Sequence, residues 1–200
     1  MTAITKISTR FYAWLLIVCG ALGLLSSYVI TLDKLKLTEN PRFVPSCNIN
    51  PIISCGSVMK TAQSNAFGFP NSWIGLAAFA AVLVVGVSML AGADFKSWYW
   101  RLFNLGMLLG VIFIHWLFIQ TVWVIHALCP WCMLTWVVTI AVFWFTTIYN
   151  LQNGHWPTPK SLKPVINFIY EYKYLLLFLW YLIIAVLILH HFWYYYGHDL

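Results

Sequence analysis

Residues 126–136 read HALCPWCMLTW and place two cysteines at CxxC spacing within a stretch, 102–159, that contains no charged residue. An uncharged run of this length has room for two membrane-spanning helices of about 20 residues each. HALCP is the plausible turn between them, because proline favours the first position of a new helix. The stretch therefore predicts two transmembrane helices with a cysteine pair at the start of the second.

The rest of the chain also predicts a membrane protein. Its residues are 62% hydrophobic and 8% charged, whereas soluble domains average about 25% charged residues. The first apolar segment is too long for a signal peptide and has no clear cleavage site, so we expect it to remain as a span. The segments long enough to cross a bilayer are 11–32, 73–93, 102–124, 129–149 and 174–196. We expect an all-α integral membrane protein with a four-helix transmembrane bundle and a fifth, C-terminal transmembrane helix.

The basic residues indicate the orientation of these helices. The formal net charge is +6, but the lysines and arginines stand singly, and nucleic-acid binding needs a basic patch or stripe. Cytoplasmic segments of membrane proteins are enriched in Lys and Arg. With the N-terminus inside, the inner segments hold Lys6, Arg10, Lys96, Arg101, Lys160, Lys163 and Lys173, and the outer loop holds Lys34, Lys36, Arg42 and Lys60. This bias predicts an N-in/C-out protein with an outer loop at 33–72, a cytoplasmic loop at 151–173 and a fifth span with a short outer tail at 174–200.

Four of the five cysteines fall on the predicted outer side. Cys19 lies within the first span, where a lone cysteine is usually a small buried hydrophobe. The outer cysteines are Cys47, Cys55, Cys129 and Cys132. A zinc site is one alternative, although the two spacings are unequal and the compartment is oxidising. Purely structural disulfides are another, although a CxxC bridge closes too small a loop to stabilise much. A disulfide relay explains two pairs on one oxidising face best.

The position of the CxxC pair favours reactivity. If Cys129 is the N-cap and Pro130 the first helical residue, both cysteines lie at the positive end of a helix dipole. The thiol pKa at such sites falls from about 8.5 to roughly 3.5–7.5, and the thiolate is the reactive species. Cys132, one turn deeper, is expected to face the membrane interior, where a lipid-soluble electron acceptor could reach it. Cys129 is expected to face the outer water.

The outer loop contains further candidates. Prolines at 41, 45 and 51 indicate an irregular run up to Cys55, and residues 57–66 are expected to form a short surface helix. Phe67, Phe69 and Trp73 are either interfacial anchors or pocket residues. Asn71 either hydrogen-bonds a carbonyl group or caps the following helix. His115 and His126 are either proton carriers or ordinary hydrogen-bonded histidines, and a metal site at His190, His191 and His198 is a minor alternative.

Several of these motifs together resemble the vitamin K epoxide reductase family. They are C-x7-C in the first outer loop, SCGSVM, FGFPN and the later LCPWC, within residues 10–150. The chain is most similar to bacterial homologues that oxidise periplasmic thiols and pass the electrons to a quinone. The resemblance implies a four-helix catalytic domain over 1–150, with Cys47 and Cys55 as a shuttle pair and Cys132 as the cysteine that meets the quinone. It also implies that Asn71 contacts a quinone carbonyl and that Thr61 matches the hydroxyl residue of the family.

Two departures from the family pattern narrow the expected function. Trp136 stands where the vertebrate enzymes have a tyrosine, which disfavours vitamin K epoxide as the substrate, although an indole N–H can still donate to a quinone oxygen. The chain stops after a fifth span instead of continuing into a fused thioredoxin-like domain, so we expect a separate DsbA-like thioredoxin-fold partner. The acceptor is expected to be menaquinone or ubiquinone.

We therefore expect a thiol:quinone oxidoreductase in a bacterial plasma membrane, with its active site on the extracytoplasmic side. One alternative is a non-catalytic membrane protein, such as a transporter subunit, with structural outer disulfides. The lack of an inverted repeat and of charged residues inside the spans disfavours transport. The second alternative is a vitamin K epoxide reductase proper.

Overall fold

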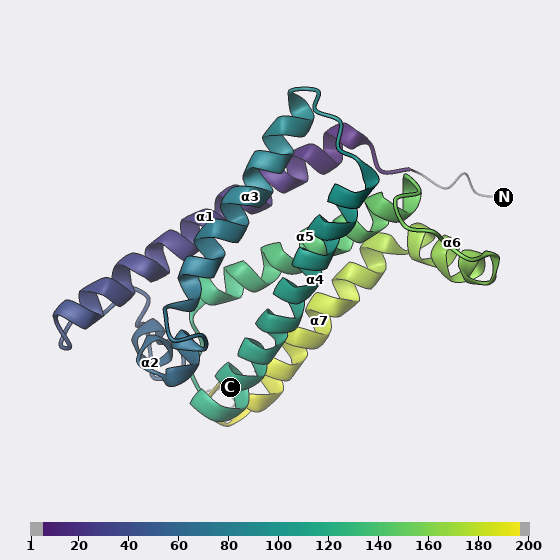
Figure 1. The fold of residues 1–200 in the computed structure, drawn as a ribbon. Coiled ribbons are helices and arrows are strands. Elements are labelled where there is room, and N and C mark those ends of the chain that lie inside the picture. Colours follow the sequence, from purple (N-terminus) through teal and green to yellow (C-terminus); the bar gives the residue numbers. More distant parts are fainter. Residues whose placement is uncertain (1–5, 197–200) are drawn as a thin grey trace.

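The computed structural model describes residues 6–196. Within this range the regular secondary structure is helical, and the segments between the helices contain one isolated backbone bridge, between Ile53 and Leu128 (Figure 1). The helices are α1 Thr9–Glu39, α2 Cys55–Met59, η1 Ala62–Asn65, α3 Asn71–Leu90, α4 Ser97–Ile119, η2 Gln120–Ile125, α5 Pro130–Gln152, η3 Lys160–Leu162, α6 Lys163–Glu171, α7 Lys173–His191 and α8 Trp193–Tyr196. Five helices are long and apolar enough to cross a membrane, α4 and η2 counting as one. The predicted all-α fold with five apolar spans is confirmed.

Two predicted boundaries in the outer segment were wrong. The first helix does not end near residue 32 but continues to Glu39, because Leu37 in its last turns is buried against the outer loop. The predicted helix over 57–66 is divided into α2 and η1. Thr61 has an extended backbone between them, and its hydroxyl donates to the Val58 carbonyl at 2.8 Å, a local bond that competes with helix continuation.

Helix α1 makes the most extensive helix–helix contacts of the bundle. It packs along α3 and α5, and α5 also packs against α4. Glycines allow the closest approach: a Cβ at Gly20 of α1 would stand 2.8 Å from the backbone nitrogen of Leu83 in α3, and one at Gly86 would stand 2.9 Å from the carbonyl oxygen of Ala13. In contrast, α3 does not pack along α4. The two helices are both held through other elements, which leaves space between them.

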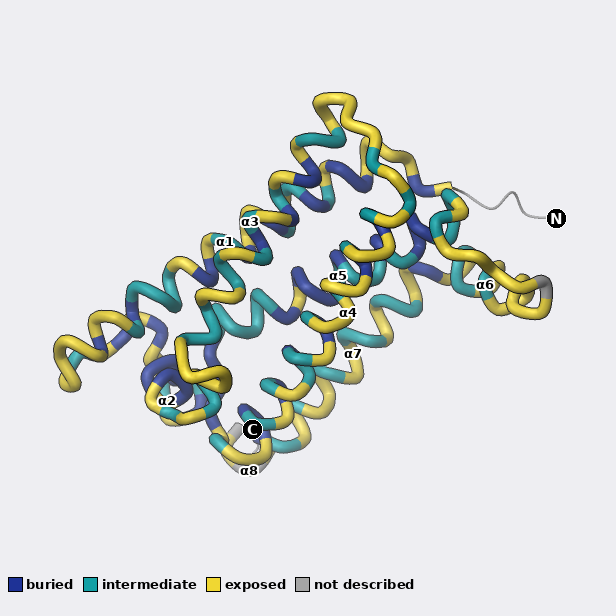
Figure 2. The backbone as a smooth tube through the Cα atoms, viewed as in Figure 1, coloured by how far each residue is buried: buried dark blue, intermediate teal, exposed yellow. Residues whose placement is uncertain are grey.

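An aromatic cluster fills one end of the bundle, near the N-terminus of α1. Tyr12 is fully buried, lies 4.4 Å from Tyr149 between ring centroids, and shares a 2.7 Å hydrogen bond with the Thr146 hydroxyl. The Asn150 amide donates to the Trp100 carbonyl at 3.0 Å. Figure 2 shows that the buried residues of α5 gather toward this end, whereas those of α1 are spread along the helix. Helices α1, α4 and α5 are therefore joined tightly there.

The chain reverses direction between α4 and α5 through an unusual turn. The last residues of the third span form a π-helix, Gln120–Ile125, which ends at His126 in the left-handed conformation with φ of 56°. The following residues form the bridge with the outer loop, and α5 begins at Pro130. π-Helical turns are rare and often occur at functional sites.

The fifth apolar helix, α7, is attached to the outside of α4 and α5 mainly by aromatic side chains. Trp180 donates to His115 at 3.1 Å, and Tyr181 donates to the Val137 carbonyl at 2.8 Å. Most other side chains of α7 are exposed or half-buried (Figure 2). Residues 197–200 of the predicted outer tail, including His198, lie outside the described residues.

Candidate functional site

The CxxC pair lies at the first turn of α5, as predicted. Cys129 is the N-cap and Pro130 the first helical residue, and the Cys129 sulfur accepts a hydrogen bond from the backbone N–H of Cys132 at 3.4 Å. Both thiols are free; Cys129 is buried and Cys132 is half-buried. This capping arrangement brings both sulfurs to the N-terminus of a transmembrane helix.

The two loop cysteines form a disulfide, Cys47–Cys55, with a Cα–Cα distance of 5.7 Å. Two asparagines shape the loop around it. The side-chain oxygen of Asn48 accepts from the Gly56 N–H at 2.8 Å, and that of Asn50 accepts from the N–H groups of Ile52 and Ile53. The zinc alternative would need four thiolates, and this bond engages two of the four cysteines.

The structure brings the four predicted cysteines into one cluster. Cys47, Cys55 and Cys129 are buried together, and Cys132 packs against them. The parallel bridge between Ile53 and Leu128 sets this arrangement, through hydrogen bonds of 2.9 Å from Ser54 N–H to the Leu128 carbonyl and 2.6 Å from Leu128 N–H to the Ile52 carbonyl. Cys129 directly follows Leu128, and Cys55 is two residues after Ile53. Their proximity therefore depends on backbone pairing between segments about 75 residues apart.

The surroundings of Cys129 favour its thiolate. The pKa of this thiol is lowered, first because the Cys132 side chain donates a hydrogen bond to it, and further by backbone N–H groups of Cys132 and Trp131. Burial and the charge of Asp33 act in the opposite direction. Hydrogen bonds to a sulfur stabilise its ionised form. Cys129 is therefore prepared to react as a nucleophile.

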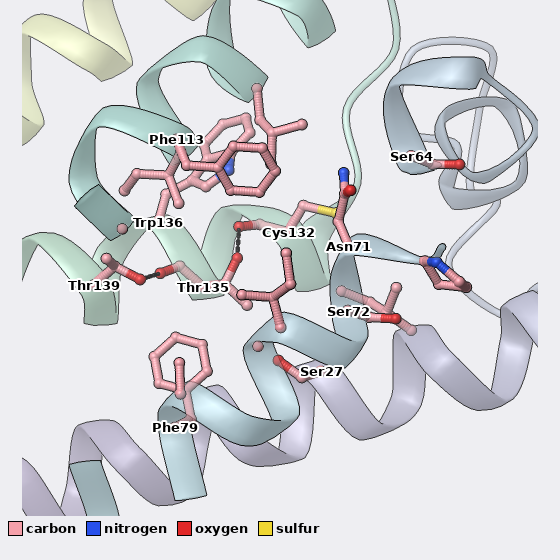
Figure 3. A pocket seen from close by; sticks show the side chains of 18 of the residues that line it. Ser27, Ser64, Asn71, Ser72, Phe79, Phe113, Cys132, Thr135, Trp136 and Thr139 are labelled. Carbon is pink, nitrogen blue, oxygen red and sulfur yellow. Dashed lines mark hydrogen bonds between the residues drawn. The ribbon is translucent and has the colours of Figure 1, made fainter. Parts of the chain in front are cut away.

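A cavity of about 520 Å³ lies beside the cysteine cluster, between α1, α3, α4 and α5. One face of α5 lines it, formed by Cys132, Thr135, Trp136 and Thr139 at the i, i+3, i+4 and i+7 positions of a helix. The hydroxyls of Thr135 and Thr139 bond back to carbonyls of their own helix, each at 2.7 Å (Figure 3). The wall is otherwise mostly apolar and includes Phe79 of α3 and Phe113 of α4. Sequence reasoning missed both threonines, although the helical spacing from Cys132 was a signal that could have revealed them.

The predicted quinone contacts divide into two groups. Trp136, Phe67 and Asn71 line the cavity. Thr61 and Phe69, both among the described residues, are not part of its wall. The Thr61 hydroxyl instead closes the end of α2, and Phe69 stacks with Trp73 at 6.1 Å between ring centroids.

Asn71 holds the loop above the cavity. Its side-chain nitrogen donates to the Gln63 carbonyl at 2.7 Å, and its oxygen accepts from the Ala66 N–H at 3.0 Å. It is the first residue of α3 and not its N-cap. A side-chain amide has two N–H groups, so one donor remains for a ligand.

The two histidines near the site have other partners. His115 accepts at Nε2 from Trp180 and therefore carries its proton at Nδ1, which lies 2.8 Å from the Val111 carbonyl. This neutral ring joins α4 to α7. His126 is exposed, and its Nδ1 lies 3.0 Å from Nε2 of His191 at the end of α7. Neither ring is part of the cysteine cluster or lines the cavity.

Comparison with known proteins agrees with this site. None of the curated proteins compared with the chain matches it. The model of the vitamin K epoxide reductase family matches residues 14–147, which run from α1 to α5 and include both cysteine pairs and the cavity. The chain therefore belongs to the vitamin K epoxide reductase family, a membership that indicates a multi-pass membrane oxidoreductase acting on disulfides.

Proposed function

We propose that the protein is a membrane thiol:quinone oxidoreductase that supports disulfide bond formation. It oxidises a separate thioredoxin-fold protein of the DsbA type through Cys47 and Cys55, and it passes the electrons through Cys129 and Cys132 to a quinone. The catalytic domain is 1–150, with α7 as an additional span. The orientation is N-in/C-out in a bacterial plasma membrane, and the cysteine cluster lies on the extracytoplasmic side, where disulfides persist.

The position of Cys132 carries this proposal. Its side chain packs against the cluster that contains the loop disulfide, and it also lines the cavity between the helices. Cys132 is thus the residue through which a thiol reaction in the loop can reach a molecule held among the transmembrane helices. A purely structural disulfide would not require this connection.

The first exchange takes place at the loop disulfide. Cys47 is 7% exposed and Cys55 is 0% exposed, so an incoming thiolate reaches Cys47 more easily. Attack of the partner thiolate on the Cys47 sulfur breaks the Cys47–Cys55 bond, forms a mixed disulfide with the partner, and leaves the electron pair on Cys55. The second partner thiol then resolves the mixed disulfide and leaves Cys47 reduced.

The second exchange follows from the backbone bridge. Cys55 lies beside Cys129, so its thiolate attacks the Cys129 sulfur when the CxxC pair is oxidised. This step breaks the Cys129–Cys132 bond and leaves the electron pair on Cys132, whose side chain lines the cavity. Cys47 then displaces Cys129 from Cys55. The loop disulfide re-forms and the CxxC pair is left reduced, which is the redox state of this structure.

The cavity has the character expected for a quinone. Ligand pockets are mostly apolar, with a few convergent polar groups, and this one offers the remaining N–H of Asn71 and the indole of Trp136 among apolar walls. A bound quinone would supply an acceptor for two electrons and two protons. Trp136 and Asn71 would hold its oxygens, and Cys132 would face its ring.

The direction of electron flow follows from the partner. A DsbA-type protein has a reduction potential near about −120 mV, so ordinary thiol buffers are too reducing to re-oxidise it. A quinone dissolved in the membrane is a sufficient oxidant, and a protein of transmembrane helices can meet it. The quinone is of the menaquinone or ubiquinone class.

The direct test uses the purified protein, a reduced DsbA-like thiol protein and a short-chain ubiquinone or menaquinone analogue. Quinone absorbance is followed for the wild type, for Cys132→Ala and for Cys19→Ala, which removes the cysteine outside the cluster. We expect wild-type and Cys19→Ala proteins to reduce quinone and Cys132→Ala to be inactive. Equal rates with and without Cys132 would contradict the proposal, and thiol-driven reduction of vitamin K epoxide in place of quinone would establish the alternative function.

A further inference from the structure

A buried acid beside the cysteine cluster has no role in the exchanges described above. Asp33 of α1 is only 7% exposed, and its Oδ2 is buried without a hydrogen-bond partner among the described residues. A buried carboxylate oxygen is costly unless it is paired. The neighbouring cation does not compensate for it, because the Lys34 ammonium donates to the Met59 carbonyl and to the Ser64 hydroxyl.

Asp33 lies on the face of α1 that covers the cysteines. Ile30 and Leu37, three residues before it and four after it, both belong to the cluster with Cys47, Cys55 and Cys129. Residues three and four apart share one face of a helix. The acid is therefore held on the side of α1 that packs against the cysteine pairs.

Asp33 and Cys129 interact electrostatically. The charge of Asp33 raises the pKa of the Cys129 thiol and so opposes the other influences on it. Of the groups in the cluster that α1 covers, Cys129 and Cys132 are free thiols, while Cys47 and Cys55 are bonded to each other. On α1 itself, Lys34 faces the Met59 carbonyl, and Lys36 lies over the Phe43 ring. The electrostatic partner of Asp33 in the reactive cluster is thus Cys129.

We propose that Asp33 accepts the proton of Cys129 when the reduced CxxC pair is oxidised. This inference rests on the proposed function, which supplies a quinone as the oxidant. Formation of the Cys129–Cys132 bond breaks both S–H bonds and releases two electrons and two protons. The electron pair left on the Cys129 sulfur forms the S–S bond, while the pair that leaves Cys132 reduces the quinone. The Cys129 proton passes to Asp33 and from there to outer water, and the quinone takes up two protons in total.

Proton transfer to Asp33 resolves a conflict between two negative charges. A thiolate on Cys129 beside an ionised Asp33 is unfavourable, since like charges at close range oppose each other. When the proton moves from sulfur to carboxylate, the thiolate forms as Asp33 becomes neutral. The pair therefore keeps one negative charge throughout.

The test compares Asp33→Asn, Asp33→Glu and, as a matched control, Glu39→Gln at the exposed end of the same helix. Alkylation of Cys129 by iodoacetamide is measured between pH 5 and 9 by peptide mass spectrometry, with the loop disulfide intact. Single-turnover reduction of a short-chain ubiquinone analogue by the pre-reduced protein is measured separately. For Asp33→Asn we expect Cys129 alkylation at pH 6 to rise severalfold, because the opposing charge is gone. We expect quinone reduction to fall by about 10²-fold, the usual range for loss of a proton-transfer group.

These two changes in opposite directions distinguish proton transfer from structural support. Asp33→Glu should restore most of the quinone rate, and Glu39→Gln should behave as the wild type in both measurements. Unchanged quinone reduction in Asp33→Asn would overturn the inference. So would an Asp33→Asn protein that loses Cys129 alkylation, quinone reduction and the loop disulfide together, since this would indicate a structural role. A wild-type protein that reduces no quinone would overturn the proposed function instead, and the alkylation profiles would still decide whether Asp33 acts on Cys129.

Discussion

Helix α5 has two different halves. Near Gln152 its side chains are buried and joined to other helices, as the bonds of Thr146 to Tyr12 and of Asn150 to Trp100 show. Near Pro130, Cys132, Thr135, Trp136 and Thr139 border an open cavity, and both threonine hydroxyls bond only to carbonyls of their own helix. One helix thus acts as a core element at one end and as the wall of a ligand site at the other. The packing near Gln152 holds the helices in place, so that the cavity near Pro130 can remain open.

The largest expected effects come from the two loop cysteines, which lie in the cluster at the Pro130 end of α5. With Cys55→Ala, Cys47 is left as a lone thiol. It should displace the small thiol from a single-cysteine partner protein that is supplied as a mixed disulfide with nitrothiobenzoate, and so trap the partner on Cys47. With Cys47→Ala, Cys55 should be trapped on Cys129. Both variants should oxidise the partner no faster than the uncatalysed reaction while keeping helical circular dichroism, since neither side chain joins two transmembrane helices. Non-reducing electrophoresis with peptide mapping identifies the bonds; partner trapped on Cys55, or Cys47 bonded to Cys129, would reverse the assigned order.

The second largest effect is expected where Tyr12 of α1 packs against the Gln152 end of α5. There a substitution should change the stability of the protein and not its catalytic rate. Tyr12→Ala removes a fully buried ring and its hydroxyl bond, so we expect the free energy of unfolding to fall by about 3–5 kcal/mol. Quinone reduction per folded molecule should stay at the wild-type rate. Trp14→Ala, at an exposed position of the same helix, is the matched control and should change the free energy of unfolding little. Chemical denaturation in detergent measures the difference, and a Tyr12→Ala protein that is stable but inactive would show that the two halves are not separate.

Filling the cavity should give an intermediate effect. Gly106 of α4 lines the cavity, and a Cβ there would meet no atom within 4 Å. Gly106→Leu should raise the quinone KM about tenfold, equivalent to about 1.4 kcal/mol, without weakening α4, because glycine is the poorer helix former by about 1 kcal/mol. Leu105→Phe adds volume at an exposed neighbouring position outside the cavity wall and should leave KM unchanged. Equal KM values for both variants would place the quinone elsewhere.

The smallest expected effect is a shift in the pH dependence of Cys129 alkylation. Its pKa is lowered chiefly by the hydrogen bond from Cys132, so its thiolate should persist to lower pH than that of an ordinary cysteine, whose pKa is about 8.5. The alkylation midpoint in the folded protein should therefore lie below that of the same cysteine in urea. Cys132→Ala removes the main cause, so the midpoint should move upward. An unchanged midpoint in Cys132→Ala would mean that the hydrogen bond from the Cys132 side chain does not activate Cys129.

The sequence predicted the elements whose signals are local. Apolar runs near 20 residues indicated all five spans, and the Cys-Pro pair indicated the start of α5, because helix capping depends on neighbours along the chain. It did not predict that α1 extends to Glu39 or that the loop helix divides at Thr61. Both depend on contacts with the cysteine cluster or on a local side-chain bond that competes with the helix.

The amino-acid sequence by itself thus determined an all-helical membrane protein with two cysteine pairs, one of them at a helix N-terminus. Composition and the spacing of a few residues suffice for this conclusion. Only the tertiary structure decided that Cys55 lies beside Cys129, that Thr135 and Thr139 border the cavity below Cys132, and that Asp33 is buried at the cluster. The reason is that these relations depend on the bridge between Ile53 and Leu128 and on the open space between α3 and α4. Both are products of packing between segments far apart in the chain.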